Sequence, residues 1–90
     1  MKTIWKFPIA ITDDQFIEMP KTASILTCQM QFGCPVVWAL VETDSEMTKR
    51  NLVVLGTGNP CPDDVEELAY VSTIQQHGGS LVWHVFERFL

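Results

Sequence analysis

Two glycine-rich stretches carry the residues of this chain that are best suited to binding chemistry. The first is residues 75–79, QQHGG, in which His77 precedes Gly78 and Gly79. Glycine adopts positive φ without a steric penalty, so the pair is typical of a tight turn. The same glycines expose backbone N–H groups that can form an anion-binding concavity, and His77 would add a charge-assisted hydrogen bond. The two interpretations are compatible, and the residues alone do not separate them.

The second stretch is residues 56–60, GTGNP. Its simplest interpretation is the end of a strand that leads into a loop. Thr57, Gly58 and Asn59 also combine short polar side chains with a flexible backbone, which suits a phosphate or the edge of a base. The stretch lacks the Gly-Lys-Ser/Thr ending of a P-loop and the third glycine of a dinucleotide fingerprint. Any ligand here would be held without a known nucleotide-binding motif.

A third candidate is the neighbouring pair Trp5 and Lys6, close to the start of the chain. Strands near a terminus are often exposed, and an exposed indole ring can stack on a nucleobase, which is worth about 1–3 kcal/mol per base. The other two tryptophans, Trp38 and Trp83, lie in the middle of apolar segments and are expected in the core. These positions complete the predicted ligand site: His77, Gly78, Gly79, Thr57, Gly58, Asn59, Trp5 and Lys6.

We expect no catalytic residue, no metal site and no cofactor. Nucleophilic catalysis requires a serine or cysteine together with a base and an orienting group, and no spacing in the chain supports such a set. The second histidine, His84, falls on an alternating face and is expected to be half-buried and hydrogen-bonded. The cysteines lack CxxC spacing, and the acidic residues 63–67 form no repeated oxygen-ligand pattern. The chain is therefore expected to be a binding protein rather than an enzyme.

Length, composition and charge restrict the partners. Ninety residues make a single domain, 1–90, and the 47% hydrophobic content suggests that a partner, such as another copy, covers part of the surface. Six basic residues and a formal charge of −5 argue against binding to duplex nucleic acid. An odd count of three cysteines indicates reduced thiols. No apolar run is long enough to span a membrane and the start does not resemble a signal peptide, so a cytoplasmic location is expected.

Hydrophobic residues recur with a period of two along most of the chain, which predicts strands. Residues 44–50 are expected to be a charged loop or one helical turn, and residues 65–76 combine a possible helical turn with a strand. Gly33 and Gly78–Gly79 mark tight connections. The predicted fold is therefore all-β, a small antiparallel sandwich or barrel of about seven strands. The expected strands cover residues 3–9, 15–19, 24–32, 35–43, 51–57, 70–76 and 80–87.

Several segments together resemble a family of short phage and prophage proteins that is classified only as a domain of unknown function. These segments are KTIWKFP, IEMP, ILTCQMQFGCPVVWALV, GTGNPCPDD and QQHGGSLVWHVFE, and HGGSLVWHVFE is the most specific of them. The resemblance implies no catalytic residues. It implies a phage accessory protein that acts in the host cell, in counter-defence or host takeover, and some phage proteins of similar size form oligomers that sequester nucleotide second messengers.

Two functions are therefore expected. The first is a non-enzymatic, homo-oligomeric protein that captures a small anionic ligand such as a nucleotide second messenger. The alternative is a protein-interaction module that inhibits a host protein by direct binding, through edge-strand pairing or a hydrophobic patch. The first function predicts a response to nucleotides, whereas the second predicts capture of one host protein.

Overall fold

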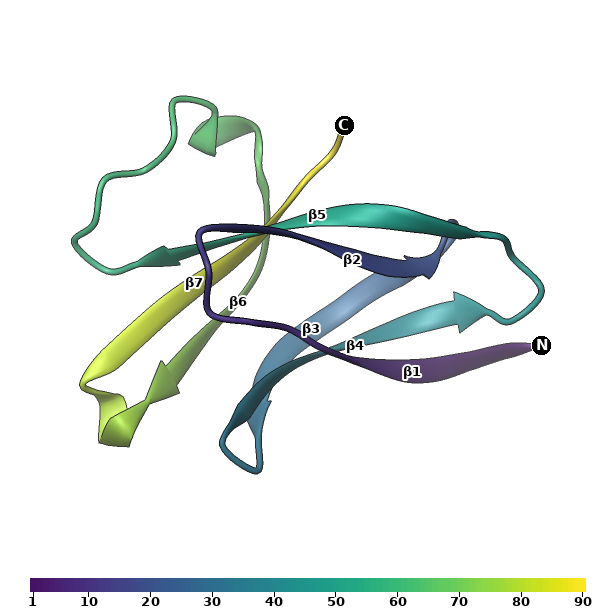
Figure 1. Cartoon of the computed structure of the whole chain (residues 1–90), viewed down its shortest axis with the longest axis horizontal. Coiled ribbons are helices and arrows are strands. Elements are labelled where there is room, and N and C mark those ends of the chain that lie inside the picture. Colours follow the sequence, from purple (N-terminus) through teal and green to yellow (C-terminus); the bar gives the residue numbers. More distant parts are fainter.

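The computed structural model describes all residues, 1–90, as two antiparallel sheets that contain seven strands (Figure 1). The three-stranded sheet has the order β1 (Lys2–Pro8), β4 (Cys34–Glu42), β3 (Ser24–Gln31). The four-stranded sheet has the order β2 (Asp14–Pro20), β5 (Met47–Gly56), β7 (Leu81–Arg88), β6 (Ala69–Gln76). Two short 3-10 turns, η1 (Val65–Glu67) and η2 (His77–Gly79), flank β6. No helix has the length and apolar character needed to cross a membrane.

The structure confirms the predicted all-β fold of seven antiparallel strands, while the two sheets do not close into a barrel. The helical turn and the strand predicted within residues 65–76 are both present, as η1 and β6. The loop predicted for residues 44–50 was wrong, because β5 already begins at Met47. The charged residues at the start of β5 led to the loop prediction, because charged residues are typical of exposed loops. Arg50 points inward and pairs with the buried Glu87, so its charge does not indicate a loop.

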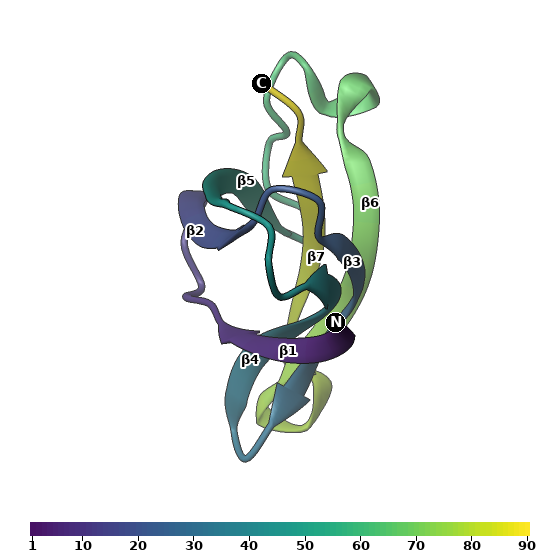
Figure 2. The same cartoon turned by 90° about the vertical axis from the view of Figure 1, so that its right-hand side faces the viewer.

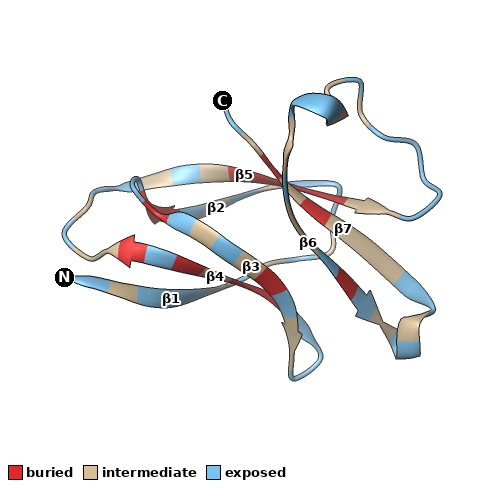
Figure 3. Ribbon diagram, turned by 180° about the vertical axis from the view of Figure 1, so that it is seen from behind, coloured by how far each residue is buried: buried red, intermediate tan, exposed pale blue.

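The core lies between the two sheets and is built from alternate residues of the strands. On β4, Val37, Ala39 and Val41 are buried and pack against the inward side chains of the other strands. Figure 3 shows this alternation of buried and exposed positions along the ribbon. Trp38 lies between these core residues in the chain, so it faces outward and is only half-buried. The expectation of a core position was therefore wrong for Trp38, whereas Trp83 packs against the core.

The sheets meet along two sides, which we call the bridged seam and the open seam. The bridged seam lies between β3 and β6, the last strands of their respective sheets. Here the Ser72 hydroxyl accepts the Cys28 N–H at 2.8 Å and lies 2.9 Å from the Thr27 hydroxyl. The open seam lies between β1 and β2, which do not pair with each other and are joined by residues 9–13. In Figure 2, β3 and β6 lie on one side of the molecule and β2 on the other.

Candidate functional site

A groove runs along the bridged seam and is the best candidate for a ligand site. It encloses about 440 Å³. None of its lining residues carries a formal charge, although the chain as a whole has a charge of −5. Polar side chains predominate over apolar ones. The lining residues are Cys28, Gln29 and Met30 from β3 and Ser72, Thr73, Ile74 and Gln75 from β6.

Irregularities in both strands explain why a groove forms here instead of a continuous sheet. The register of β3 shifts between Ile25 and Thr27, and that of β6 shifts between Tyr70 and Ser72. Such bulges bend a strand and interrupt its hydrogen-bond ladder. The Ser72 side chain then accepts the hydrogen bond that a neighbouring strand would otherwise accept. The two edges stay side by side without pairing, and a hollow remains between them.

Two hairpin tips follow the strands that line this groove. The β3–β4 hairpin turns at Phe32 and Gly33, with φ of 50° and 79°. The β6–β7 hairpin turns at His77, Gly78 and Gly79, with φ of 52°, 67° and 96°. Figures 1 and 2 both place the two tips at the same end of the molecule. Neither tip lines the groove itself.

The strain at the tips lies in side chains that face solvent. Phe32 and His77 are the two non-glycine residues with positive φ, a conformation that is unfavourable for a bulky side chain. Phe32 is also 96% exposed, so no packing within the chain compensates for its conformation. Backbone strain of this kind concentrates at functional positions. The two tips are accordingly the strongest indication of function in the fold.

The β6–β7 tip is directly connected to the groove. A Cβ atom added to Gly79 would lie 3.0 Å from Oε1 of Gln75, so the groove side chain rests against the turn. The Ser80 N–H and hydroxyl both donate to the His77 carbonyl, at 3.3 and 3.0 Å. These bonds do not use the N–H groups of Gly78 and Gly79. The turn thus has the positive φ values predicted for it.

The second predicted stretch lies elsewhere. Thr57 directs its hydroxyl to Nε2 of His84, at 2.7 Å, on the outer face of the four-stranded sheet. Asn59 packs back on Gly56, where an added Cβ atom would lie 2.7 Å from Nδ2 of Asn59. Gly58, with φ of 85°, turns the chain between them. Figure 1 shows the loop after β5 leading away from the β6–β7 tip, so the two glycine-rich stretches do not form one site.

His84 occupies the position that its alternation predicts. It is half-buried, and both ring nitrogens are hydrogen-bonded, since Nδ1 lies 3.0 Å from the Thr73 hydroxyl. The Tyr70 hydroxyl continues this row at 2.7 Å from Thr73. The row links β6, β7 and the segment after β5 across the outer face of the sheet. His84 is therefore satisfied within the fold, as expected.

Trp5 and Lys6 lie on β1, in the other sheet, and as adjacent residues of a strand they point to opposite faces. Trp5 shares the inner face with Phe7, at a distance of 6.4 Å between ring centroids. Lys6 faces outward and donates to Oε1 of Gln31 at 3.0 Å. The pair therefore cannot act as one stacking and charge-binding unit, and neither residue lines the groove.

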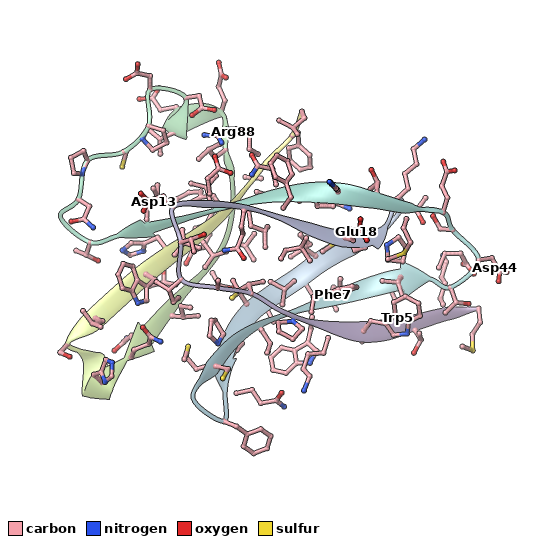
Figure 4. The ribbon with its side chains drawn as sticks, in the orientation of Figure 1. Trp5, Phe7, Asp13, Glu18, Asp44 and Arg88 are labelled. Atoms are coloured by element: carbon pink, nitrogen blue, oxygen red, sulfur yellow. The ribbon has the colours of Figure 1, made fainter.

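The long loop between β5 and β6 is fixed by Arg88, which Figure 4 shows near its base. Arg88 binds both carboxylate oxygens of Asp64, at 2.7 and 3.0 Å, and also contacts Asp14 and Asn51. The hydrogen bond from Arg88 lowers the pKa of Asp64. The hollow of about 500 Å³ beside this loop is lined by Asp13 and Asp14 and by the fully engaged Arg88, so it does not suit an anion.

Several residues of the candidate site were not predicted from the sequence. Phe32 was assigned to the end of a strand, and Gln29, Ser72, Thr73 and Gln75 were not singled out. One signal was available for Phe32, because two-residue hairpin loops prefer Asn or Asp before Gly and a phenylalanine there is unusual. The groove residues have no such signal, since they meet only when two sheets pack together.

Comparison with known proteins identifies the family of this chain. The curated proteins and the solved structures contain no match to it. A family model described as "Domain of unknown function (DUF7352)" matches residues 1–89. The match spans all seven strands, both hairpin tips and the groove. The chain therefore belongs to the DUF7352 family.

Proposed function

We propose that this chain is a non-enzymatic protein that captures a small anionic ligand of the nucleotide type in the groove of the bridged seam. The observation that carries the proposal is an uncharged groove of about 440 Å³ whose lining residue Gln75 lies next to Gly79 of the β6–β7 turn. The volume lies within the range of about 300–1,000 Å³ typical of small-molecule sites. The ligand would be bound and retained without chemical change.

Charge distribution supports the choice of this surface. A protein with a formal charge of −5 repels anions over most of its surface, and the acidic hollow beside Asp13 and Asp14 would do so strongly. The groove presents amides and hydroxyls instead of carboxylates. The side chains of Gln29 and Gln75 can each donate to an oxygen of a ligand.

The two hairpin tips suit the two ends of a nucleotide. The N–H groups of Gly78 and Gly79 follow residues with positive φ, an arrangement that favours an anion such as phosphate, and His77 can add a charged hydrogen bond. Phe32 offers an exposed ring on which a base can stack. The groove side chains between the tips would then contact the polar edge of the base or the sugar.

The resemblance to short phage and prophage proteins supports a biological role for such binding. A phage protein that retains a nucleotide second messenger would prevent it from activating a host defence enzyme. On this basis we propose a counter-defence role in the host cytoplasm, with no cofactor and no catalytic turnover.

A substitution at the β6–β7 tip tests the proposal. Asparagine tolerates positive φ, so His77→Asn removes the imidazole while it preserves the turn. We expect calorimetry with a panel of cyclic mononucleotides, cyclic dinucleotides and ADP-ribose-type nucleotides to find one ligand. Loss of a charged hydrogen bond, worth about 1.5–3 kcal/mol, should weaken its binding by about tenfold or more in this variant.

The matched control is Gly58→Asn, which places the same residue at a position of φ 85° with no atom within 4 Å of the new Cβ. We expect this variant to bind as the wild type does. If Gly58→Asn loses affinity and His77→Asn does not, the anion site lies at GTGNP instead. If no nucleotide of the panel binds the wild-type protein, the proposed function is wrong.

A second candidate function is direct inhibition of a host protein. It is favoured by apolar side chains on the outer face of the three-stranded sheet, where Ile4 is 56% and Leu40 is 38% exposed beside the half-buried Trp38. This function predicts that the immobilised protein retains one host protein from a lysate. The variant Leu40→Ser should lose that protein, whereas His77→Asn should retain it. Retention of the same protein by Leu40→Ser would argue against this surface.

A further inference from the structure

The unpaired side of β1 carries backbone groups that no other strand of the chain uses. At one end of β1 the Thr43 N–H donates to the Met1 carbonyl, at 3.0 Å. At the other end the Ile9 N–H donates to the Pro35 carbonyl, at 3.1 Å. Bonded and unbonded positions alternate along an antiparallel ladder, and the register of β1 with β4 contains no shift. The residues whose N–H and C=O groups point away from β4 are therefore Lys2, Ile4 and Lys6.

Pro8 belongs to the same series and supports this assignment. A proline is tolerated in a strand where its nitrogen faces away from the neighbouring strand, because no ladder hydrogen bond is then lost. No strand of the chain pairs with this side of β1. We call the unpaired side of β1, formed by Lys2, Ile4, Lys6 and Pro8, the β1 edge.

The β1 edge is positively charged, although the chain as a whole has a formal charge of −5. Lys2 and Lys6 stand on either side of Ile4, and none of the ion pairs of the chain includes either lysine. Glu42 lies opposite Lys2 on β4 but is bound by the N-terminal ammonium. Lys6 contacts only a neutral group, the side-chain amide of Gln31. Both positive charges are thus free to pair with a partner.

We propose that the β1 edge binds an extended strand of another protein that places acidic residues opposite Lys2 and Lys6. In antiparallel pairing an apolar residue would lie opposite Ile4, between the two acidic residues, and the residues at the alternate positions would face inward. The partner strand therefore has the pattern acidic–apolar–apolar–apolar–acidic. Opposite charges and apolar pairs directly across a ladder stabilise it, and main-chain hydrogen bonds provide the affinity.

The strands of a second copy are poorer partners for the β1 edge. If β1 paired with β1 of another copy around Ile4, Lys2 would face Lys6, and like charges directly opposite each other destabilise a ladder. The acidic residue Asp14 on β2 is already bound by Arg88 and Asn51. Charged residues on edge strands commonly restrict pairing in this way. The expected partner is therefore a different protein.

The added strand would also cover apolar surface that the chain leaves in contact with water. Ile4 is 56% exposed, and Trp5 is 38% exposed although it faces inward. An inward apolar residue of the partner would lie beside Trp5, on the side that no strand of the chain covers. The groove of the bridged seam contains no residue of β1. Strand addition therefore does not rest on nucleotide capture.

Two synthetic peptides test the proposal in an NMR titration of the wild-type protein. The peptide Gly-Glu-Val-Ile-Val-Glu-Gly has the proposed pattern, and Gly-Lys-Val-Ile-Val-Lys-Gly reverses its charges. We expect the acidic peptide to shift the amide signals of Lys2, Ile4 and Lys6 and to bind at least about tenfold more tightly than the basic peptide. The double variant Lys2→Glu with Lys6→Glu should prefer the basic peptide. The proposal is wrong if the acidic peptide does not bind, or if the two peptides bind the wild-type protein equally.

A backbone substitution locates the contact on the β1 edge. Ile4→Pro removes an N–H that faces the partner and leaves the ladder with β4 intact, so the acidic peptide should bind about tenfold more weakly. The matched control Ile4→Val keeps this N–H and should bind the peptide as the wild type does. A folded Ile4→Pro variant with unchanged affinity would show that the peptide does not pair with this edge. If Ile4→Pro does not fold, the charge reversal still decides the question.

The second candidate function uses a different surface and can be distinguished in the same titration. Leu40→Ser alters the outer face of the three-stranded sheet at β4, not the β1 edge. We expect this variant to bind the acidic peptide as the wild type does. Loss of the peptide in Leu40→Ser but not in Ile4→Pro would place the contact on the outer face and overturn the inference.

Discussion

The bridged seam and the open seam differ in how the edges of their strands are satisfied. At the bridged seam both strands are bulged, and the Ser72 hydroxyl joins them through the Cys28 N–H and the Thr27 hydroxyl. At the open seam both strands are regular, and no hydrogen bond joins their edges within the chain. The first seam is closed by side chains of the chain itself, whereas the second is left without such a bridge.

This difference shows how one small sandwich can keep two surfaces apart. Bulges prevent further strand pairing at β3 and β6 and leave an uncharged groove. Regular edges with alternating charges at β1 and β2 invite pairing but restrict the partner. Substitutions at the bridged seam should therefore change stability and ligand binding, while substitutions at the open seam should change the pairing of β1 with a partner strand.

The largest effect is expected at the buried ion pair beside the bridged seam. Arg50 and Glu87 have side chains that are 16% and 6% exposed, and their bonds measure 2.5 and 3.0 Å. Glu87→Leu leaves the guanidinium without its main partner in a poorly hydrated position. We expect the free energy of unfolding to fall by about 3–5 kcal/mol in urea denaturation.

An exposed ion pair provides the control for this change. Lys21 and Glu46 lie 3.6 Å apart with exposures of 67% and 77%, so Lys21→Met should cost less than about 1 kcal/mol. If Glu87→Leu and Lys21→Met lost the same free energy of unfolding, burial beside the bridged seam would not determine the loss of stability.

A smaller effect is expected for Ser72→Ala, which removes the hydroxyl that joins the bridged seam. The buried Cys28 N–H loses its acceptor, and an unsatisfied buried donor costs about 1–3 kcal/mol. Burial raises the pKa of the Cys28 thiol to about 11, so this thiol should react slowly at pH 8 in the native protein. We expect Ser72→Ala to lower the denaturation midpoint and to speed modification of Cys28.

Cys34 and Cys61 are exposed and serve as internal references for the labelling rate. The matched substitution is Ser45→Ala, because Ser45 donates only to a carbonyl in an exposed turn, at 3.3 Å. If Ser45→Ala accelerated the labelling of Cys28 as much as Ser72→Ala does, the bridge would not be the cause.

The smallest change in the free energy of unfolding is expected at the β3–β4 tip. There the variant should be more stable than the wild type, not less. Phe32→Asn relieves the backbone strain of a bulky residue at φ of 50° and creates the preferred Asn-Gly turn with Gly33. We expect a gain of about 1 kcal/mol in the free energy of unfolding, together with weaker nucleotide binding because the stacking ring is lost. Thermal denaturation and calorimetry on the same variant measure both effects.

The open seam supplies the comparison for this variant. Phe16→Asn removes a ring of 54% exposure that lies within a regular strand, where asparagine is unfavourable. No gain in stability is expected there. A variant Phe32→Asn that was both less stable and unchanged in binding would contradict the role assigned to the tip.

The strands could be predicted from the sequence because their alternation is local. The faces of β1 and the hairpin of β3 with β4 follow from the spacing of apolar residues and from Gly33. The start of β5 could not be predicted, because Arg50 is charged and its buried partner, Glu87, lies 37 residues away. The outward position of Trp38 was missed because apolar residues occupy both faces of β4, so alternation does not identify the inner face.

The candidate site was predictable only in part. The positive φ values of the β6–β7 tip follow from two adjacent glycines, whose lack of a Cβ atom is a property of the residue itself. Which other residues stand near that tip is a matter of sheet packing. The residues between Gly56 and Pro60 appeared equally suitable, but the row through His84 and the packing on Trp83 use them within the fold.

The sequence by itself determined that this chain forms alternating strands with tight glycine turns, because side-chain periodicity and backbone freedom act over a few neighbouring residues. It also determined the charge patterns of β1 and β2, which can be read directly from residues 2–6 and 14–18. Only the tertiary structure decided that β3 and β6 meet at Ser72 while β1 and β2 stay apart. The packing of two twisted sheets depends on all their inward side chains at once, so no local pattern specifies which edges come together.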